Sequence, residues 1–369
     1  MRIAYVNANY RVNHTGGGHV HMGQFIKNAL ALGHEIWVYP GNQYPGAKTI
    51  PTDRYHHIKT MRQMDVLYIR LESGFPNICT WSTPPKRLIY GFPLVVWEFN
   101  TIPDDALMWG IPRNQIDATI QKFKNFGKGC DLAICVAPAA ANYVEQNIGI
   151  KNIAIIPNGS DPDLFTPEAV PVPRMSPFKN SINLAWIGSA KISYHDFINL
   201  RKTARLIWEK SSIVNINFHI IGPDLKFLMA DMTPNVFYWG AENYQKLPNW
   251  LSAMNIGLYI TKGGFSTYGS PLKVFDYMSS SLAVISTDHQ AIRDLFITLD
   301  QKDLMVPCAD AEALARVIRN LASEPGRTKQ LGLAGRQLVI DKYNWRRALK
   351  DTLDEIEKIF VQRNLKKRS

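Results

Sequence analysis

The sequence predicts an α/β protein with two domains, each built on a parallel β-sheet. Short, nearly unbroken apolar runs alternate with helical stretches along almost the whole chain of 369 residues, as they do in β–α–β units. The runs are rich in Val, Ile and Leu, which is typical of strands buried on both faces. The composition, 46% hydrophobic and 20% charged, is that of a globular protein.

The predicted strands form two sets separated by a proline-rich segment. The first set comprises 3–6, 36–39, 66–69, 94–97, 132–136 and 153–156, and the second comprises 182–187, 218–221, 236–239, 256–260 and 282–285. Five prolines between residues 162 and 177 oppose regular structure and predict a linker. We therefore expect a first domain over 1–165, a linker over 166–180 and a second domain over 181–345. Two such Rossmann-like domains facing each other would form a ligand cleft at the carboxyl ends of their strands.

The chain carries excess positive charge, with a formal net charge of +11. Such a surface attracts nucleic acid, anionic lipid or phosphorylated substrates. The sequence shows no nucleic-acid-binding motif, so we expect no nucleic acid partner. The stretch 122–128, in which three lysines surround Phe123 and Phe126, and the tail 366–368 predict peripheral contact with an anionic membrane. Solvated helix faces and a frayed tail are the alternative.

The sequence also predicts a cytoplasmic protein. No apolar run approaches the roughly 20 residues of a membrane helix, and the first residues lack the apolar core of a signal peptide. The four cysteines are scattered and fit no zinc or redox spacing, so we expect reduced thiols: Cys79, Cys130, Cys135 and Cys308.

The stretch 269–286, GSPLKVFDYMSSSLAVIS, is the most informative part of the sequence. Small residues lead into a predicted amphipathic helix that starts near Pro271. The free N–H groups of a first helical turn, with the positive end of the helix dipole, favour anions. Three residues are expected to hold a diphosphate: Ser270, Pro271 and Leu272. We expect Lys273 to face the same anion and Asp276 to accept hydrogen bonds from sugar hydroxyls, which together predict a nucleotide-diphosphate ligand.

Three glycines, Gly16, Gly17 and Gly18, stand before the first predicted helix. Glycine lets the backbone approach a ligand closely, so this loop is predicted to face a phosphate or an acceptor substrate. A plain flexible turn is the alternative. The spacing does not give the dinucleotide fingerprint. His19 and His21 would point to different sides of the helix, which argues against a metal site.

A second glycine turn, at Gly188, follows the first strand of the predicted second domain. Lys191 beside it suits a diphosphate as a point charge. His195 could assist as a neutral or charged donor, or could act as a helix cap.

Asp161, Pro162 and Asp163 spell the DxD pattern of metal-dependent sugar transferases. They lie in the proline-rich segment, and Asp and Pro are ordinary turn formers. We therefore expect a turn here and no metal.

Taken in order, these motifs resemble those of retaining glycosyltransferases of GT-B fold, specifically glycosyltransferase family 4 (glycosyl transferases group 1). The stretch 156–167, IPNGSDPDLFTP, is similar to the family's IPNGVDxxxFxP junction, and 270–286 is similar to its variant SPLKLFEYMAxGxPVxAS. Residues 236–240 and 244–260 look like the region of nucleotide-base contacts. The closing helices match as well, through ADAEALARVIRNLASEP and KYNW.

The resemblance implies that the second domain binds a nucleotide sugar and the first binds the acceptor, with no metal or other cofactor. It also implies that the C-terminal helix, 346–369, packs back on the first domain and ends in a basic tail. Asp276 takes the place of the family's ribose-binding Glu, and Tyr268 that of its second acidic residue. The family has a basic pair after the glycine turn. In this chain the Arg position is Ser189 or Ala190, and His195 lies near the position of the Lys; Lys191 and Lys273 are expected to substitute.

In the first domain, Glu98 and Asn100 match an ExN variant that follows a strand in relatives. Glu98 is the carboxylate expected beside the sugar, with Asn100 toward the acceptor. Two residues in the loop that leads to the glycines, Arg11 and Asn13, are also expected to contact the acceptor.

The resulting prediction is a metal-independent hexosyltransferase that retains anomeric configuration. It would move a hexose from a UDP- or GDP-sugar to a glycan or lipid-linked acceptor, in cell-surface polysaccharide or glycolipid synthesis, at the inner face of the membrane or in the cytoplasm. A GT-B sugar-nucleotide epimerase, a catalytically inactive nucleotide-sugar-binding relative, and a binding protein that closes on a solute without chemistry are the alternatives.

Overall fold

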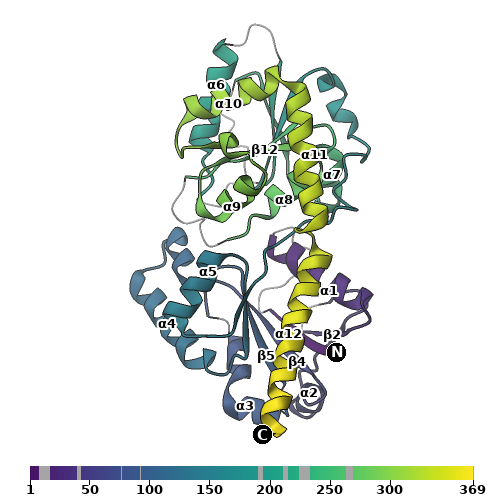
Figure 1. The fold of residues 1–369 in the computed structure, drawn as a ribbon, viewed down its shortest axis with the longest axis vertical. Coiled ribbons are helices and arrows are strands. Elements are labelled where there is room, and N and C mark those ends of the chain that lie inside the picture. Colours follow the sequence, from purple (N-terminus) through teal and green to yellow (C-terminus); the bar gives the residue numbers. More distant parts are fainter. Residues whose placement is uncertain are drawn as a thin grey trace. The chain divides into compact units, whose positions relative to one another are not determined.

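The chain folds into two compact units. The computed structural model describes residues 1–7, 17–39, 43–75, 77–91, 93–189, 194–210, 215–223, 233–262 and 269–368. Unit 1 contains residues 1–158, 268–270 and 345–369, and unit 2 contains 159–267 and 271–344. The chain therefore passes between the units several times (Figure 1).

Unit 1 is built on a parallel sheet, with strand order β3-β2-β1-β4-β5-β6-β7 in the described part of the chain. Its strands are β1 (Arg2–Val6), β2 (Glu35–Val38), β3 (Lys48–Thr49), β4 (Val66–Leu71), β5 (Leu94–Phe99), β6 (Leu132–Cys135) and β7 (Ile153–Ile155). Its helices are α1 (Gly17–Ala31), α2 (Arg54–Met61), α3 (Pro84–Ile89), α4 (Arg113–Gly127), α5 (Pro138–Tyr143) and α12 (Trp345–Arg368).

Alternating side chains of the strands fill one core on each face of this sheet. On β1, Ala4 and Val6 join a core with residues of α2, α4 and α5. Ile3 and Tyr5 point to the other face and join a core with residues of α1 and α12. The continuous apolar runs predicted this burial on both faces. Polar side chains of these strands are therefore expected near the strand ends.

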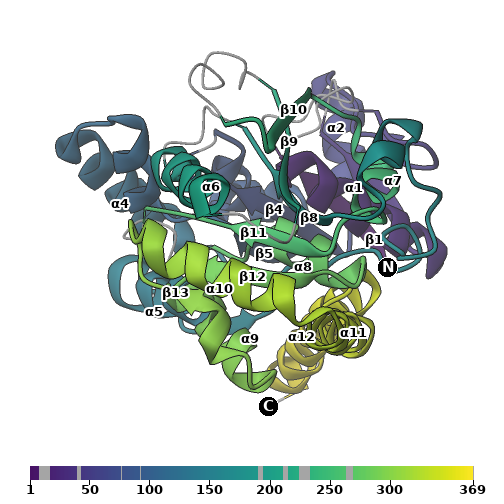
Figure 2. The same cartoon turned by 90° about the horizontal axis from the view of Figure 1, so that it is seen from above.

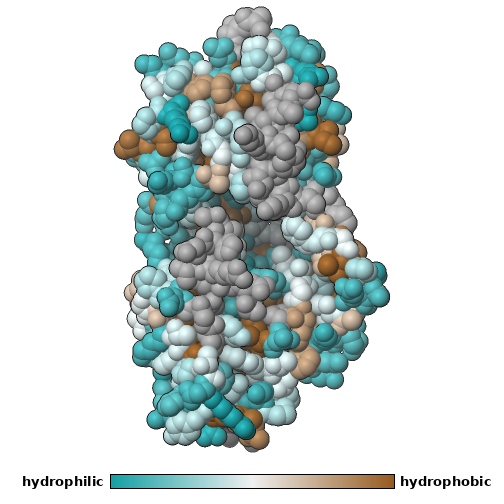
Figure 3. Space-filling model, turned by 180° about the vertical axis from the view of Figure 1, so that it is seen from behind, coloured by the Kyte–Doolittle hydropathy of each residue, from teal (hydrophilic) through white to brown (hydrophobic). Residues whose placement is uncertain are grey.

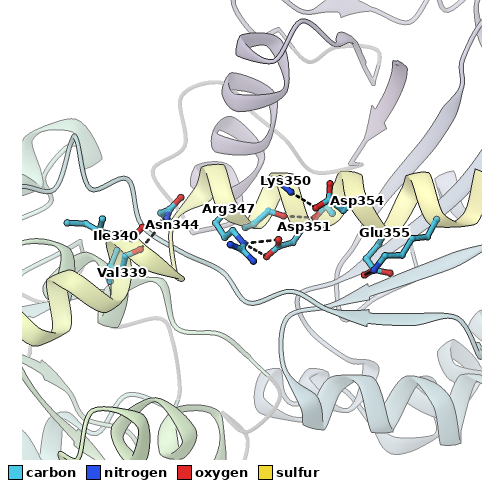
Figure 4. A network of polar contacts seen from close by, with 11 residues as sticks. Val339, Ile340, Asn344, Arg347, Lys350, Asp351, Asp354 and Glu355 are labelled. Carbon is cyan, nitrogen blue, oxygen red and sulfur yellow. Dashed lines mark hydrogen bonds and ion pairs between the residues drawn. The ribbon is translucent and has the colours of Figure 1, made fainter.

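Helix α12 returns the C-terminus of the chain to unit 1. Its apolar face, including Leu349, Leu353 and Ile356, is buried against the sheet and α1. The solvent side carries ion pairs one turn apart, Arg347 with Asp351 and Lys350 with Asp354 (Figure 4). Such spacing supports a helix, although each exposed pair contributes only a few tenths of a kcal/mol.

Unit 2 has a second parallel sheet, with order β10-β9-β8-β11-β12-β13 among the described residues. Its strands are β8 (Ile182–Ile187), β9 (Ile216–Ile221), β10 (Val236–Gly240), β11 (Ile256–Tyr259), β12 (Ala283–Thr287) and β13 (Met305–Val306). Its helices are α6 (Phe197–Lys210), α7 (Leu247–Leu251), α8 (Leu272–Ser279), α9 (Gln290–Thr298), α10 (Ala311–Ser323) and α11 (Pro325–Asp341). Helix α6 packs with α10, and α8 packs with α11 (Figures 1 and 2).

The proline-rich segment differs from its prediction as a linker. Unit 2 begins at Gly159, so residues 166–180 lie within it. Phe165 and Met175 are buried in the unit 2 core, which explains why the segment is held there. The edge strands β3 and β13 were not predicted, because two residues are too few to show a hydrophobic pattern.

Close packing of α11 against the turn after α8 gives a testable prediction. A Cβ on Gly332 would lie 2.0 Å from the carbonyl oxygen of Ser281, whereas a Cβ on Gly326 of the same helix meets nothing within 4 Å. We expect Gly332→Ala to destabilise the protein by about 1–3 kcal/mol through overpacking. Gly326→Ala is the control and should be neutral or stabilising by up to about 1 kcal/mol. Urea unfolding measures both; equal stability of the two variants would contradict the packing.

Candidate functional site

A glycine turn ends β8 and admits a lysine ammonium from another element. The N–H of Gly188 donates to the carbonyl of Ile221 at 3.0 Å. A Cβ at this position would lie 2.8 Å from Nζ of Lys273 and 2.6 Å from the Trp186 side chain. Only glycine therefore leaves room for the lysine here. The glycine turn and Lys273, which the sequence analysis assigned separately to a diphosphate, lie together.

Lys273, on the first turn of α8, places its ammonium among aromatic rings. Nζ lies 4.7 Å from the ring centroid of Trp186 and 5.8 Å from that of Tyr259. Both distances are within the range of a cation–π interaction. Loss of hydration lowers the pKa of Lys273 to about 7. The ammonium thus occupies a site where charge is expensive unless an anion is present.

His195 holds this ammonium on its remaining side. The ring is buried, and its Nδ1 lies 3.0 Å from the carbonyl oxygen of Ser189. Since a carbonyl only accepts, Nδ1 carries the hydrogen, and Nε2 accepts from Nζ of Lys273 at 3.0 Å. Burial, together with the charge of Lys273, lowers the pKa of His195 to about 2. His195 is a neutral acceptor for Lys273, which differs from the donor to the diphosphate that the sequence suggested.

Helix α8 begins one residue later than predicted. Pro271 is its N-cap and not a residue of the first turn, which starts at Leu272. The first N–H groups of a helix have no partner within it, so the N-terminus of α8 presents donors beside Lys273. Ser270, before the cap, accepts from the backbone N–H of Asn158 at 3.1 Å and from its side-chain amide at 2.8 Å.

Asp276 lies on α8 with its carboxyl group buried. Oδ1 accepts from the hydroxyls of Ser160 at 2.6 Å and Tyr244 at 3.4 Å. Burial raises the pKa of Asp276 to about 7, and the nearby charge of Asp161 acts in the same direction. The hydroxyls that contact Asp276 in this structure are thus protein hydroxyls, where sugar hydroxyls were predicted.

Glu98 is the centre of a second polar group, in unit 1. It is the fifth residue of β5 and is 1% exposed. Its carboxylate accepts from the Tyr68 hydroxyl at 2.7 Å and pairs with Nε2 of His21 at 3.2 Å and Nε of Arg70 at 3.3 Å. The Asn100 amide donates to it as well. Burial alone would raise the pKa of Glu98, but these partners outweigh it and lower the pKa to about 2. Glu98 is therefore a carboxylate.

A small cavity of about 20 Å³ lies beside this group, within unit 1. That volume is enough for about one water molecule. His21, Tyr68 and Glu98 line it together with Trp345 of α12. Nδ1 of His21 is buried without a hydrogen-bond partner among the described residues. Gly17 and Gly18, predicted to precede α1, form its first turn, and a Cβ on Gly18 would lie 3.3 Å from Arg70.

The predicted site residues thus fall into two groups, one in each unit. Gly188, His195 and Lys273 lie together in unit 2, and Glu98 and Asn100 lie together in unit 1. Four predicted residues are outside the described part of the chain: Arg11, Asn13, Lys191 and Tyr268. Sequence reasoning missed Trp186 as the ring under Lys273, and His21, Tyr68 and Arg70 as partners of Glu98, because their separation along the chain gives no pattern.

The DxD-like segment forms the predicted turn. The backbone N–H of Leu164 donates to the carbonyl of Asp161 at 3.0 Å, as in a β-turn. Within the described ranges, no three His, Cys, Asp or Glu side chains are grouped so that they could hold a metal ion. None of the described helices is long and apolar enough to cross a membrane.

Comparison with known proteins places most of unit 2 in a family. Residues 182–324 match the family described as Glycosyl transferases group 1. The matched stretch contains Gly188, His195, Lys273 and Asp276, so it includes the polar group of unit 2.

A curated relative and solved structures match the chain along nearly all of its length. The MMP α-(1→4)-mannosyltransferase of Mycolicibacterium hassiacum is 21% identical over 424 residues, covering 98% of this chain and 99% of that protein. A glycosyltransferase structure from Rickettsia africae aligns with a TM-score of 0.70 and 14% identity, over 97% and 98% of the two chains. The Anabaena protein HepE, solved with UDP and glucose, aligns at 0.68 with 10% identity, over 96% and 99%. The fold is GT-B, as predicted.

The raised pKa of Asp276 gives a prediction about stability. Its value in the folded protein, about 7, lies above the ordinary 3.8, so the folded state favours the protonated carboxyl. This contribution is complete below pH 4 and is lost as the pH rises through 7. Asp276→Asn keeps an acceptor for Ser160, so we expect it to be more stable than the wild type at pH 8, by a few kcal/mol, and similar at pH 4.

Thermal unfolding at the two pH values tests this. Asp303→Asn, at a largely exposed position of the same unit, is the control and should show little change between them. If Asp276→Asn lost stability equally at both pH values, the carboxyl would not be held in its protonated form.

Proposed function

We propose that the protein transfers a hexosyl unit, with retention of anomeric configuration, from a UDP- or GDP-sugar to a glycan or lipid-linked acceptor. The group 1 domain, the mannosyltransferase relative and the alignment with a structure that contains UDP and glucose support this. A cytoplasmic location, a role in cell-surface polysaccharide or glycolipid synthesis, and chemistry without a metal or other cofactor belong to the same proposal.

The observation that carries the proposal is the poorly hydrated ammonium of Lys273 at a glycine turn and a helix N-terminus. A departing nucleoside diphosphate gains negative charge as the glycosidic bond breaks. Fixed donors in a water-poor environment stabilise such charge far better than water does. A bound diphosphate would raise the pKa of Lys273 again, so that the lysine is charged when the donor is present.

His195 contributes by position. Its Nε2 accepts from Nζ, and its Nδ1–H is fixed on Ser189, so the ring cannot turn without breaking a hydrogen bond. Because the ring is neutral, it fixes the ammonium without repelling it. We place Ser270, Pro271, Leu272 and Lys191 around the same diphosphate.

In unit 1 we assign Glu98 to the sugar and the acceptor. An ionised carboxylate accepts hydrogen bonds from hydroxyls and stabilises the positive charge that develops on a sugar ring, but it has no proton to give. Nδ1 of His21, buried and without a hydrogen-bond partner among the described residues, is a further polar atom beside Glu98. Arg11 and Asn13, with Gly17 and Gly18 at the start of α1, are proposed to complete the acceptor side.

The proposal predicts that Lys273→Met weakens binding of UDP- and GDP-sugars by roughly 10- to 100-fold, as expected for a charge-assisted contact. The variant should not unfold. A lowered pKa means that the folded state binds fewer protons than the unfolded state between pH 7 and 10.5, so the lysine costs stability below that range. Lys202→Met, at an exposed position of α6, is the control.

Calorimetric titration gives the affinities, and chromatography of a reaction with labelled donor gives the activity. Unchanged affinity in Lys273→Met would remove the donor site assignment. A new sugar nucleotide formed without any acceptor would indicate the epimerase instead, and binding without turnover would indicate an inactive relative.

A further inference from the structure

Three helical segments meet at the end of unit 1 where the strands begin. They are 54–62, which contains α2, 84–89, which is α3, and 358–368, the last turns of α12. Nε of Arg62 donates to the carbonyl of Ile89 at 2.9 Å and joins the first segment to the second. Arg87 and Arg363 both pair with Asp131, at 2.9 and 3.3 Å, and join the second to the third. Figure 1 shows α2, α3 and the C-terminus at this end.

The three segments hold most of the excess charge of the chain. They contain ten Lys and Arg residues and no Asp or Glu, in a protein whose net charge is +11. The basic residues are Arg54, Lys59, Arg62, Lys86, Arg87, Lys358, Arg363, Lys366, Lys367 and Arg368. Acidic neighbours offset part of this charge: Asp131 is shared by two arginines, Glu355 pairs with Lys358, and Asp53 caps α2.

Large apolar side chains are exposed among these basic ones. Tyr55 on the first segment is 70% exposed, Leu88 on the second is 64% exposed, and Val361 and Leu365 on the third are 59% and 62% exposed. Figure 3 shows hydrophobic side chains among hydrophilic ones at the lower end of unit 1. Scattered exposed apolar residues are common, but here each basic segment carries at least one.

We propose that this surface, which we call the basic end of unit 1, docks onto an anionic lipid bilayer. Lys and Arg side chains close to an anionic bilayer are attracted to it, and the attraction weakens with salt. Aliphatic side chains that enter the interface add to it. A nucleic acid would use the positive charge but offers no apolar layer for Leu88, Val361 and Leu365, and this favours lipid.

The stretch 122–128, where the sequence predicts membrane contact, does not expose Phe123 for insertion into a bilayer. Phe123 is fully buried in the unit 1 core, and Phe126 packs against Phe75 at a centroid distance of 5.1 Å. The lysines of this stretch, Lys122, Lys124 and Lys128, are exposed, but without neighbouring exposed aromatic rings. They therefore form a matched control for charge.

Docking at the basic end leaves the other end of the sheet accessible. The strands of unit 1 are parallel, so Glu98, near the carboxyl end of β5, lies at the opposite edge from Asp131, which precedes β6. Docking would concentrate the protein at the membrane without covering the cavity beside Glu98, the carboxylate assigned to the acceptor. This purpose rests on the proposed function, whereas the docking itself does not.

Vesicle flotation tests the proposal with the full chain. Vesicles of phosphatidylcholine alone are compared with vesicles containing about a quarter phosphatidylglycerol, at low and high salt. The charge variant is Arg54→Gln/Lys59→Gln/Lys86→Gln, the apolar variant is Leu88→Ser/Leu365→Ser, and the control is Lys122→Gln/Lys124→Gln/Lys128→Gln. All of these positions are exposed, and circular dichroism melts confirm folding.

We expect the wild type and the control to bind the anionic vesicles, binding to fall at least fivefold in both the charge and the apolar variants, and high salt to weaken it. Absence of wild-type binding, or an equal loss in the control, would overturn the proposal. So would full binding by the apolar variant, which would indicate a simple polyanion site. Transfer to a short water-soluble acceptor should be unchanged in the charge variant. If no transfer occurs in any form while vesicle binding follows this pattern, the proposed function fails and the docking surface stands.

Discussion

The desolvated ammonium of Lys273 is the interaction on which the functional account of this protein depends. A lysine loses hydration when it lies over an indole ring, and its pKa falls to about 7 as a result. Such a site destabilises the charged lysine in the free protein and stabilises it in a complex with an anion. Burial removes hydration free energy from the ammonium, and a bound diphosphate replaces it with favourable charge–charge interaction. The lysine therefore favours an anionic ligand.

The fold brings this site together from distant parts of the chain. Strand β8 supplies Trp186 and the Gly188 turn, the segment before α6 supplies His195, and α8 supplies Lys273. Each has a structural reason for its place: glycine removes a clash with Nζ, and the carbonyl of Ser189 fixes the tautomer of His195. In unit 1, ion pairs with His21 and Arg70 keep Glu98 ionised. Gly188 directly follows β8, and Glu98 lies near the carboxyl end of β5.

The sequence predicted the fold well because strands buried on both faces leave a clear apolar pattern. The strand predicted over 182–187 is β8 with the same bounds, and the strand predicted over 66–69 is β4, which continues to Leu71. Helix α12 packs on unit 1, as the resemblance implied. The edge strands were missed, and the proline-rich segment was predicted as a linker, because their burial depends on tertiary packing. For the site, local motifs located Gly188, Lys273 and Glu98. They could not show that His195 faces Lys273 or that Arg70 faces Glu98, since such contacts depend on side-chain direction across the sheet.

Proton uptake on donor binding tests the central claim most directly. The diphosphate of a UDP- or GDP-sugar has no titrating group near neutral pH, so any proton taken up must go to the protein. Titration calorimetry at pH 8 in two buffers of different ionisation enthalpy gives the number. The account predicts uptake close to one proton per site in the wild type and none in Lys273→Met. Donor binding without proton uptake in the wild type would contradict it.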